Sequence, residues 1–198
     1  MQMLILARHG ESEYSACGLL NGDPGVEVGL TAVGEQQARA LGRTLAGTPL
    51  ALCVVTALGR TRRTAEAALE GRDVSCETWP DLSDPRPGSF EGAHLDDYRA
   101  WAWTAGSAEA APGGGESRAD CVVRYARAYR ALLERPEATI LAVLHALPIA
   151  YLLGALEGRA PAARMDRSIE YAQPYRVDAA HLGPAVSVLE AWCAAPTW

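Results

Sequence analysis

The most restrictive feature of the sequence is a short apolar run, Leu4-Ile5-Leu6-Ala7, that ends at Arg8-His9-Gly10-Glu11-Ser12. A run of this length is typical of a buried strand and is too short to span a membrane. Ligands of α/β sheets bind just beyond the carboxyl ends of strands, so we expect Arg8 and His9 to lie at such a site. Gly10 permits either a backbone conformation that other residues disfavour or a close approach that a side chain would block. An arginine beside a histidine indicates an anion site with a nucleophile or base, although a salt-bridged surface turn accounts for these residues equally well.

The composition is that of an ordinary globular chain. With 198 residues, 49% apolar and 21% charged, we expect a single domain over residues 1–198. The net charge of −6 argues against nucleic acid as a partner, because no basic excess is present to neutralise phosphates, but it allows a local basic pocket for a small anion. The five cysteines form no CxxC pair, and neither a signal peptide nor a membrane span is evident. We therefore expect a cytoplasmic protein with no membrane contact.

Strand-like and helix-like segments alternate along the chain. Besides the N-terminal run, strands are predicted at 50–55, 74–78 and 138–144, and two closing strands at 175–177 and 185–189. Helices are predicted at 31–46, 60–69, 94–103, 117–134 and 149–156, and loops at 14–29 and 80–92. This alternation predicts an α/β fold, a three-layer α/β/α sandwich with a mostly parallel central sheet.

Two more residues with suitable chemistry follow predicted strands. His145 ends the strand at 138–144, and Arg60 begins the helix after the strand at 50–55. A doubly wound sheet can bring these strand ends beside His9.

Two predicted helices carry side chains that need separate interpretation. On the helix at 117–134 the apolar positions form one face, and Arg124, Arg127 and Arg130 fall largely on the other, where the last two are expected to be solvated. On the helix at 94–103, the aromatic residues Tyr98, Trp101 and Trp103 are expected to pack as a helix face. If they line a pocket instead, they favour a bulky or partly apolar ligand.

Several sequence segments, taken in their order along the chain, resemble motifs of the histidine phosphatase superfamily, which has the phosphoglycerate mutase-like fold. Leu6-Ala7-Arg8-His9-Gly10-Glu11-Ser12 is similar to the family's Arg-His-Gly-Glu-Thr/Ser signature, and Thr56-Ala57-Leu58-Gly59-Arg60-Thr61 to its Ser-Pro-Leu-x-Arg segment. Further matches follow in the expected order, at Leu30-Thr31 with Gly34 and Gln37-Ala38, at 82–92, at Gly113-Gly114-Gly115-Glu116-Ser117 and at Val143-Leu144-His145.

The resemblance implies a role for each matching residue. His9 is expected to be the nucleophile that accepts a phosphoryl group, and Arg8, Arg60 and His145 are expected to clamp the phosphate oxygens. Asp84, where the family usually has glutamate, is expected to donate a proton to the leaving group, with Glu91 as the second choice. The other implied positions are the phosphate-binding residues Asn21, Gly22 and Ala146 (the last where the family usually has glycine) and the supporting residue Glu11.

Phosphoryl transfer to histidine needs side chains of these types. Guanidinium groups offset the charge of a phosphate monoester with forked donors and are never deprotonated. A neutral imidazole is an adequate nucleophile, and a phosphohistidine divides hydrolysis into two easier steps. In-line displacement then depends on positioning and electrostatics, so we expect neither a metal nor another cofactor. No Cys/His spacing fits a zinc site.

We therefore expect an enzyme that hydrolyses a small phosphomonoester. Phosphoglycerate mutase is an alternative, but it must also bind a carboxylate, and the basic residues for this are not evident because 80–92 carries only Arg86. A phospholigand-binding protein with degraded catalysis is a second alternative, suggested by Asp84 and Ala146. The sequence does not choose among phosphomonoesters, although few basic pocket residues disfavour highly phosphorylated inositides. Trp192 and Trp198 in the tail could pack on the domain or form a homodimer contact.

Overall fold

A single five-stranded sheet in the order β3-β2-β4-β1-β5 forms the centre of the molecule. The computed structural model describes residues 1–198. Its strands are β1 (Met3–Arg8), β2 (Leu52–Val55), β3 (Cys76–Thr78), β4 (Thr139–Leu144) and β5 (Pro174–Asp178). All neighbouring pairs are parallel except β1 and β5. The mostly parallel sheet predicted from the sequence is therefore confirmed.

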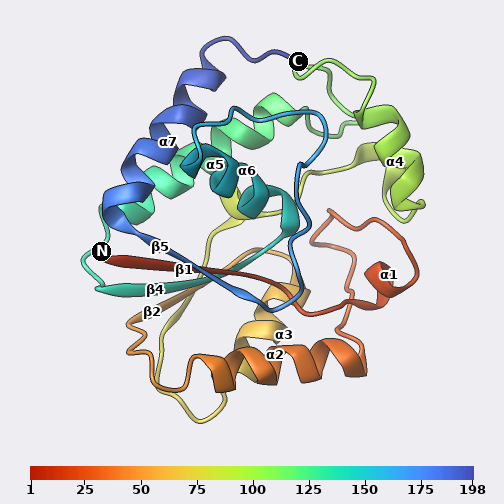
Figure 1. Cartoon of the computed structure of the whole chain (residues 1–198). Coiled ribbons are helices and arrows are strands. Elements are labelled where there is room, and N and C mark those ends of the chain that lie inside the picture. The colour runs from red at the N-terminus through yellow and green to blue at the C-terminus, as the bar shows by residue number, and fades with distance from the viewer.

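Helices cover both faces of this sheet (Figure 1). On one face lie α2 (Ala32–Thr44) and α3 (Gly59–Ala68), and on the other lie α5 (Arg118–Leu133), α6 (Ala146–Leu156) and α7 (Ala179–Cys193). The short α1 (Glu13–Ala16) and α4 (Leu95–Ala102) lie to one side of the sheet, and two single-turn 3₁₀ helices, η1 (Pro80–Leu82) and η2 (Gly88–Phe90), occupy the proline-rich segment. None of these helices has the length and apolar composition that a membrane crossing requires.

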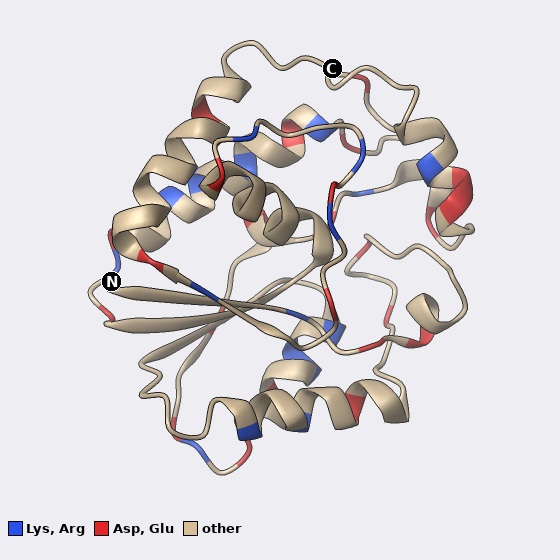
Figure 2. Cartoon of the chain, viewed as in Figure 1, with Lys and Arg blue, Asp and Glu red and all other residues tan.

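The apolar run of β1 is continuous because both of its faces are buried. Successive residues of a strand point to opposite faces. Leu4 and Leu6 pack in the core beneath α5, α6 and α7, whereas Ile5 and Ala7 pack in the core above α2 and α3. Charged residues accordingly lie on helices, loops and strand ends rather than along the central strands (Figure 2).

The parallel register of β1 and β4 brings the two strand-end histidines together. Arg8 pairs with Leu144, so the next residue of each strand is a histidine at the same edge of the sheet. The backbone N–H of His9 donates to the carbonyl oxygen of Leu144 at 2.9 Å. β2, the other neighbour of β4, ends at Val55, so the segment that leads to Arg60 leaves the same edge.

The prediction of a second closing strand at 185–189 was wrong, because these residues lie within α7. Leu182, Val186 and Leu189 are buried at helical spacing in the core that α5 and α6 share. The alternation of apolar and small residues was misleading, because Ser187 lies on the exposed face of a helix. Pro184 lies inside this helix, at a position where proline is normally unfavourable.

Candidate active site

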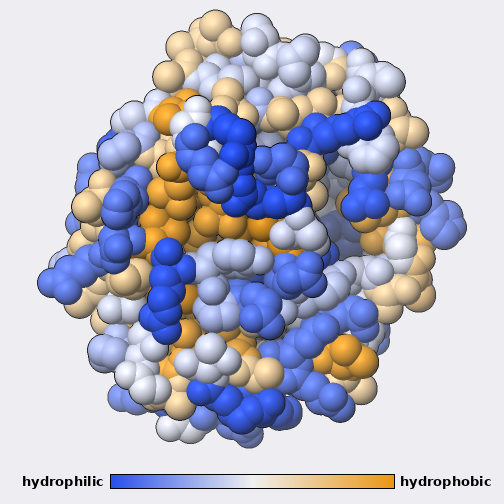
Figure 3. Space-filling view, viewed as in Figure 1, coloured by the Kyte–Doolittle hydropathy of each residue, from blue (hydrophilic) through white to orange (hydrophobic).

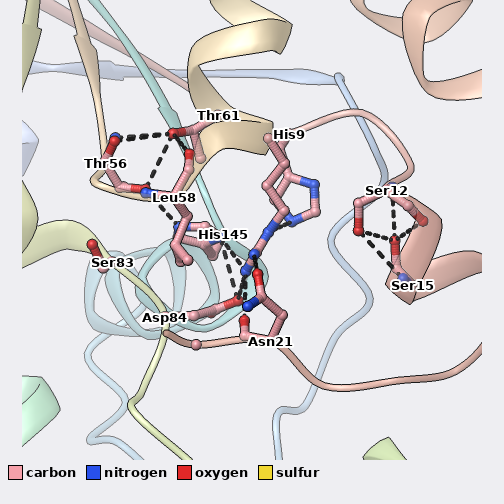
Figure 4. A network of polar contacts seen from close by, with 12 residues as sticks. His9, Ser12, Ser15, Asn21, Thr56, Leu58, Thr61, Ser83, Asp84 and His145 are labelled. Carbon is pink, nitrogen blue, oxygen red and sulfur yellow. Dashed lines mark hydrogen bonds and ion pairs between the residues drawn. The ribbon is translucent and has the colours of Figure 1, made fainter. Parts of the chain in front are cut away.

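Three strand ends supply the centre of the site, which Figure 4 shows from close by. His9 follows β1, His145 follows β4, and Arg60 is the second residue of α3. The two imidazole rings meet edge to face, with their centroids 5.3 Å apart. All three side chains are buried, although each carries polar or charged groups. Each therefore requires hydrogen-bonding partners within the protein.

Gly10 is required here by close packing rather than by backbone conformation. A Cβ atom at this position would overlap with the backbone carbonyl of Gly34 in α2. The N–H of Gly10 donates to Thr64 Oγ1 at 2.9 Å, which ties this turn to α3. The close approach that the sequence suggested for Gly10 is confirmed, and it fixes the backbone directly after His9.

The hydrogen bonds of His9 determine which ring nitrogen is nucleophilic. Nδ1 lies 2.7 Å from the carbonyl oxygen of Gly10 and must donate its proton there, because a carbonyl only accepts. Nε2 therefore carries the lone pair, which accepts a hydrogen bond from Arg60 Nε at 3.1 Å. Burial lowers the pKa of His9 well below its usual value, and the charges of Arg60 and Arg8 lower it further. The ring is therefore neutral at physiological pH.

Arg60 connects the polar groups of the site. Its Nη1 donates to Asn21 Oδ1 at 2.6 Å, and its Nη2 donates to Asp84 Oδ2 at 2.9 Å and lies 3.3 Å from His145 Nδ1. Burial lowers the pKa of Arg60, and the carboxylate of Asp84 opposes this effect. A guanidinium stays charged in such an environment. The structure thus places a permanent cation against the nucleophilic nitrogen.

His145 is completely buried and is held at both ring nitrogens. Nε2 lies 2.9 Å from Thr56 Oγ1. Nδ1 lies 3.3 Å from both Arg60 Nη2 and Asp84 Oδ2. Burial lowers the pKa of His145 well below its usual value, with smaller contributions from Arg60, Arg124 and Arg8.

Arg8 has a cationic group without an acidic partner. Its Nη1 donates to the carbonyl oxygen of Ile169 at 2.9 Å, and its guanidinium lies 3.8 Å from the ring centre of Tyr171. Its Nε is enclosed and has no hydrogen-bond partner. Beside it, Ala146 and Leu147 begin α6, and their N–H groups donate to no backbone carbonyl. Together these groups form an anion site of the kind found at helix N-termini.

The two candidate proton donors have different environments. Asp84 lines the cavity and contacts Arg60 and His145. Glu91 lies outside the cavity lining, and its carboxylate accepts hydrogen bonds from Asn21 Nδ2 and from the N–H groups of Gly22 and Asp23 at 2.8–3.0 Å. Glu91 therefore holds the loop around Asn21.

Other positions implied by the resemblance divide between the cavity and its support. Asn21 and Ala146 line the cavity, whereas Gly22 and Glu11 do not. A Cβ at Gly22 would overlap with the carbonyl oxygen of Pro85, so this glycine packs the loop against the segment that carries Asp84. Glu11 Oε1 accepts a hydrogen bond from Thr31 Oγ1 at 2.8 Å, which joins the turn after β1 to the start of α2.

Arg124 is a positioning residue that the sequence analysis did not identify. Its guanidinium donates to the carbonyl oxygens of Asp81, Ser83 and Asp84 at 2.6–3.0 Å and to both carboxylate oxygens of Glu116. It thereby fixes the backbone that presents Asp84. Its position beside Tyr125 and three residues after Cys121, both buried, was the available signal. Arg127 and Arg130 lie on the solvent-facing side of α5, as predicted, and form ion pairs with Asp81 and Glu190 there.

A cavity of about 620 Å³ extends from His9 to α4 and the segment 163–169. Figure 3 shows a recess between that hydrophilic segment and α4. Tyr98 and Trp103 line the cavity, so their interpretation as a packed helix face was incomplete. Trp101 packs against Tyr98 and Phe90.

The expectation of few basic pocket residues was wrong, because six arginines line the cavity: Arg8, Arg60, Arg99, Arg118, Arg164 and Arg167.

His9, Asp84 and His145 offer ligand atoms within 4.8 Å of one another, which is a spacing that a metal ion could use. The guanidinium of Arg60 contacts all three of these side chains. A metal ion at this position would have to displace a buried, permanently charged group. The donor set therefore suits an anion bound to Arg60 better than a second cation.

Comparison with known proteins shows which family the chain belongs to. The family model of the histidine phosphatase superfamily (branch 1) matches residues 4–191. The chain belongs to this superfamily, whose members include phosphatases and phosphoglycerate mutases.

Individual relatives of both kinds are similar to the chain. A 2,3-bisphosphoglycerate-dependent phosphoglycerate mutase of Methylobacterium sp. is 37% identical over 62% of this chain and 64% of its own length. An adenosylcobalamin/α-ribazole phosphatase of Salmonella typhimurium is 36% identical over 50% of this chain and 52% of its own. The chain thus spans about half to two thirds of these two relatives. The crystal structure of the α-ribazole phosphatase from Shigella flexneri superposes with a TM-score of 0.77 at 28% identity, covering 89% of this chain and 90% of that one.

Proposed function

We propose that the chain hydrolyses small phosphomonoesters through a phosphohistidine formed on Nε2 of His9. The observation that carries this proposal is the fixed tautomer of His9. The Gly10 carbonyl holds the proton on Nδ1, so that the lone pair of Nε2 lies against Arg60. A neutral nucleophile beside permanent cations is what attack on a phosphate dianion requires.

In the proposed first step, the phosphate oxygens accept hydrogen bonds from Arg8, Arg60 and the N–H groups at the start of α6, while Asn21 orients Arg60 through its Oδ1. His145 contributes through its contact with Arg60. Nε2 of His9 then forms a bond to phosphorus as the bond to the ester oxygen breaks. Asp84 gives its proton to that oxygen, and the alcohol leaves.

In the second step a water molecule attacks the phosphohistidine. Asp84 takes a proton from this water as the new oxygen–phosphorus bond forms and the nitrogen–phosphorus bond breaks. Inorganic phosphate is released, and both His9 and Asp84 return to their initial protonation states. No electron donor or metal is required for this cycle.

Phosphoglycerate mutase is a second candidate, because mutases are among the similar proteins and because the cavity has more arginines than the phosphate alone requires. A mutase must retain the phosphohistidine until the second substrate position reacts. Measurable dependence of turnover on 2,3-bisphosphoglycerate would favour this alternative over hydrolysis.

For the setting of the reaction, we propose the cytoplasm, with the phosphomonoester as the partner rather than nucleic acid or a membrane. All five cysteines are free, which supports a reducing compartment. Trp192 and Trp198 stack on each other within the chain at 5.4 Å, so the packing of the tail does not require a homodimer.

The decisive experiment measures phosphate release from a panel of phosphomonoesters without added metal, for the wild type and for His9→Ala. We expect turnover that falls by about 10⁴-fold or more in the variant. Rapid quenching of the wild type should also trap acid-labile phosphate on His9. Unchanged turnover in His9→Ala would refute the mechanism, whereas tight phosphate binding without turnover by folded wild type would favour a binding protein with degraded catalysis.

A further inference from the structure

Arg118 is a half-buried cation for which the proposed phosphoryl transfer has no use. It is the first residue of α5 and lines the cavity. Of its three guanidinium nitrogens only Nη1 has a partner, the hydroxyl of Tyr151 at 3.2 Å. Its Nε is enclosed and without any partner. Keeping such a group away from water without compensation is unfavourable, so its position calls for a ligand.

The other arginines of the cavity do not share this situation. Arg60, Arg99 and Arg167 each form an ion pair with a carboxylate of the chain. Arg164 is exposed and lies over the ring of Trp103 at 4.4 Å. Apart from Arg8, which faces the phosphate position, Arg118 is therefore the half-buried arginine of the cavity that lacks an acidic partner.

Tyr98 supplies a second unpaired polar group at the same place. Its side chain is buried, lines the cavity and has a hydroxyl with no hydrogen-bond partner. The guanidinium of Arg118 lies 5.6 Å from the centre of this ring. Burial raises the pKa of Tyr98, so the hydroxyl keeps its proton. Two unpaired donors from different helices, α4 and α5, thus lie together in the cavity wall.

The neighbouring Tyr151 holds Arg118 in place. The Tyr151 hydroxyl accepts from Arg118 and donates to the carbonyl oxygen of Ala162 at 3.0 Å. The Tyr151 hydroxyl therefore uses its one proton on Ala162 and accepts from Nη1 of Arg118 alone. The other N–H groups of Arg118 remain for a ligand. A cation fixed in this way loses little conformational entropy when an anion binds.

We propose that Arg118 and Tyr98 form a second anion-binding subsite, which binds an acidic group, a carboxylate or a second phosphate, on the alcohol part of the substrate. This inference rests on the proposed function, since it specifies the class of phosphomonoester that the same cavity takes. A guanidinium matches a carboxylate or phosphate with parallel N–H donors, and a phenolic hydroxyl adds a third donor.

The test compares ω-carboxyalkyl phosphates of increasing chain length with the corresponding neutral ω-carbamoylalkyl phosphates. The measured quantity is the ratio of kcat/KM for each carboxylate to that for its amide. We expect a wild-type ratio well above one for at least one chain length, and a decrease of about 10- to 100-fold in that ratio for Arg118→Met. Tyr98→Phe should reduce the ratio by a few-fold. The control, Arg99→Met, removes an arginine of the same cavity that is already paired with Asp96 and should keep the wild-type ratio.

Because the readout is a ratio, a variant that is merely less stable or less active changes both substrates alike. A preference that persists in Arg118→Met, or a wild type without preference at any chain length, would overturn the subsite. If the wild type releases no phosphate at all, the hydrolase proposal fails instead. Calorimetric titration of the same matched pairs into His9→Asn then measures separately whether the carboxylate binds more tightly than its amide. Tighter binding of the carboxylate supports the subsite. Equal binding, or a preference that persists when Arg118→Met is added, overturns it.

Discussion

At the scale of single residues, the two carboxylates of the proline-rich segment have complementary roles. Asp84 lies against Arg60 and His145 within the cavity. Glu91 is occupied by three donors of the loop that carries Asn21. Asp84 lines the cavity, where a leaving group can reach it, whereas Glu91 lies outside the cavity lining. This geometry supports the proposed proton transfer by Asp84 and gives Glu91 a role in positioning the loop.

Replacing Asp84 by asparagine should slow the reaction in proportion to the basicity of the leaving group. We expect kcat for alkyl phosphates to fall by about 10²- to 10⁴-fold, because their alkoxides need a proton, and kcat for p-nitrophenyl phosphate to change far less. A plot of log kcat against leaving-group pKa for wild type and Asp84→Asn measures this. The matched variant Glu91→Gln should leave the slope unchanged; a steeper slope in that variant would assign proton transfer to Glu91.

The residues that could be placed without the family resemblance lie close to strand ends: His9 and His145 directly follow strands, and Arg60 begins the helix after β2. His9, His145 and Arg60 could be placed together because parallel strands end at one edge of a sheet. Arg118, Arg124 and Tyr98 lie on helices, where periodicity shows only which face is apolar. Whether a polar residue at the margin of that face contacts solvent, a loop or a cavity depends on what packs against the helix, and this is a tertiary property.

At the scale of elements, α5 organises the site through its arginines. Its first residue, Arg118, lines the cavity, and Arg124, nearly two turns later, binds the backbone of 81–84. Farther along the helix, Arg127 and Arg130 only form exposed ion pairs. The segment with Asp84 has few regular hydrogen bonds of its own, so the helix supplies the rigidity that a positioned proton donor needs.

Arg124→Met should therefore affect both stability and catalysis. Removing this arginine leaves the buried carboxylate of Glu116 without its main partner, and we expect a loss of about 3–5 kcal/mol in the free energy of unfolding. Urea denaturation measures this loss. The double variant Arg124→Met/Glu116→Gln should recover part of the stability but not kcat, because the carbonyls near Asp84 remain unbound. Recovery of both quantities together would show that Arg124 has no positioning role.

The element boundaries show the same division between local and tertiary information. The start of α2 was predictable because Thr31 caps it, with its side chain accepting from the N–H of Gly34 at 3.0 Å. α7 was not, because its apolar residues fit either period over a short window and Pro184 favoured a break. Packing of this segment against α5 and α6 stabilises the helix, and these contacts cannot be predicted from a local sequence pattern.

At the scale of the whole molecule, the three-layer arrangement buries two histidines at the edge of the sheet together with the cations that keep them neutral. His9 and His145 have pKa values well below the usual value, with burial as the largest cause. The same feature that provides a neutral nucleophile therefore links the stability of the entire fold to pH. In the unfolded chain both rings regain an ordinary pKa of about 6.5.

The sign of this linkage follows from the direction of the two pKa shifts. Below about pH 6.5 the unfolded chain binds protons that the folded chain does not, so the free energy of unfolding must fall as the pH falls. Each histidine contributes a slope of up to about 1.4 kcal/mol per pH unit, until the pH reaches its folded-state pKa. We expect urea denaturation in phosphate-free buffers to show nearly constant stability above pH 7 and a steady loss between about pH 6.5 and 5.

His145→Asn should remove about half of that slope, whatever its effect on stability at pH 7, whereas His181→Gln, which changes an exposed histidine, should retain it. An equal slope in wild type and His145→Asn would show that His145 is protonated in the folded protein, and Asp84, 3.3 Å from its Nδ1, would then be its counter-ion rather than a free proton donor.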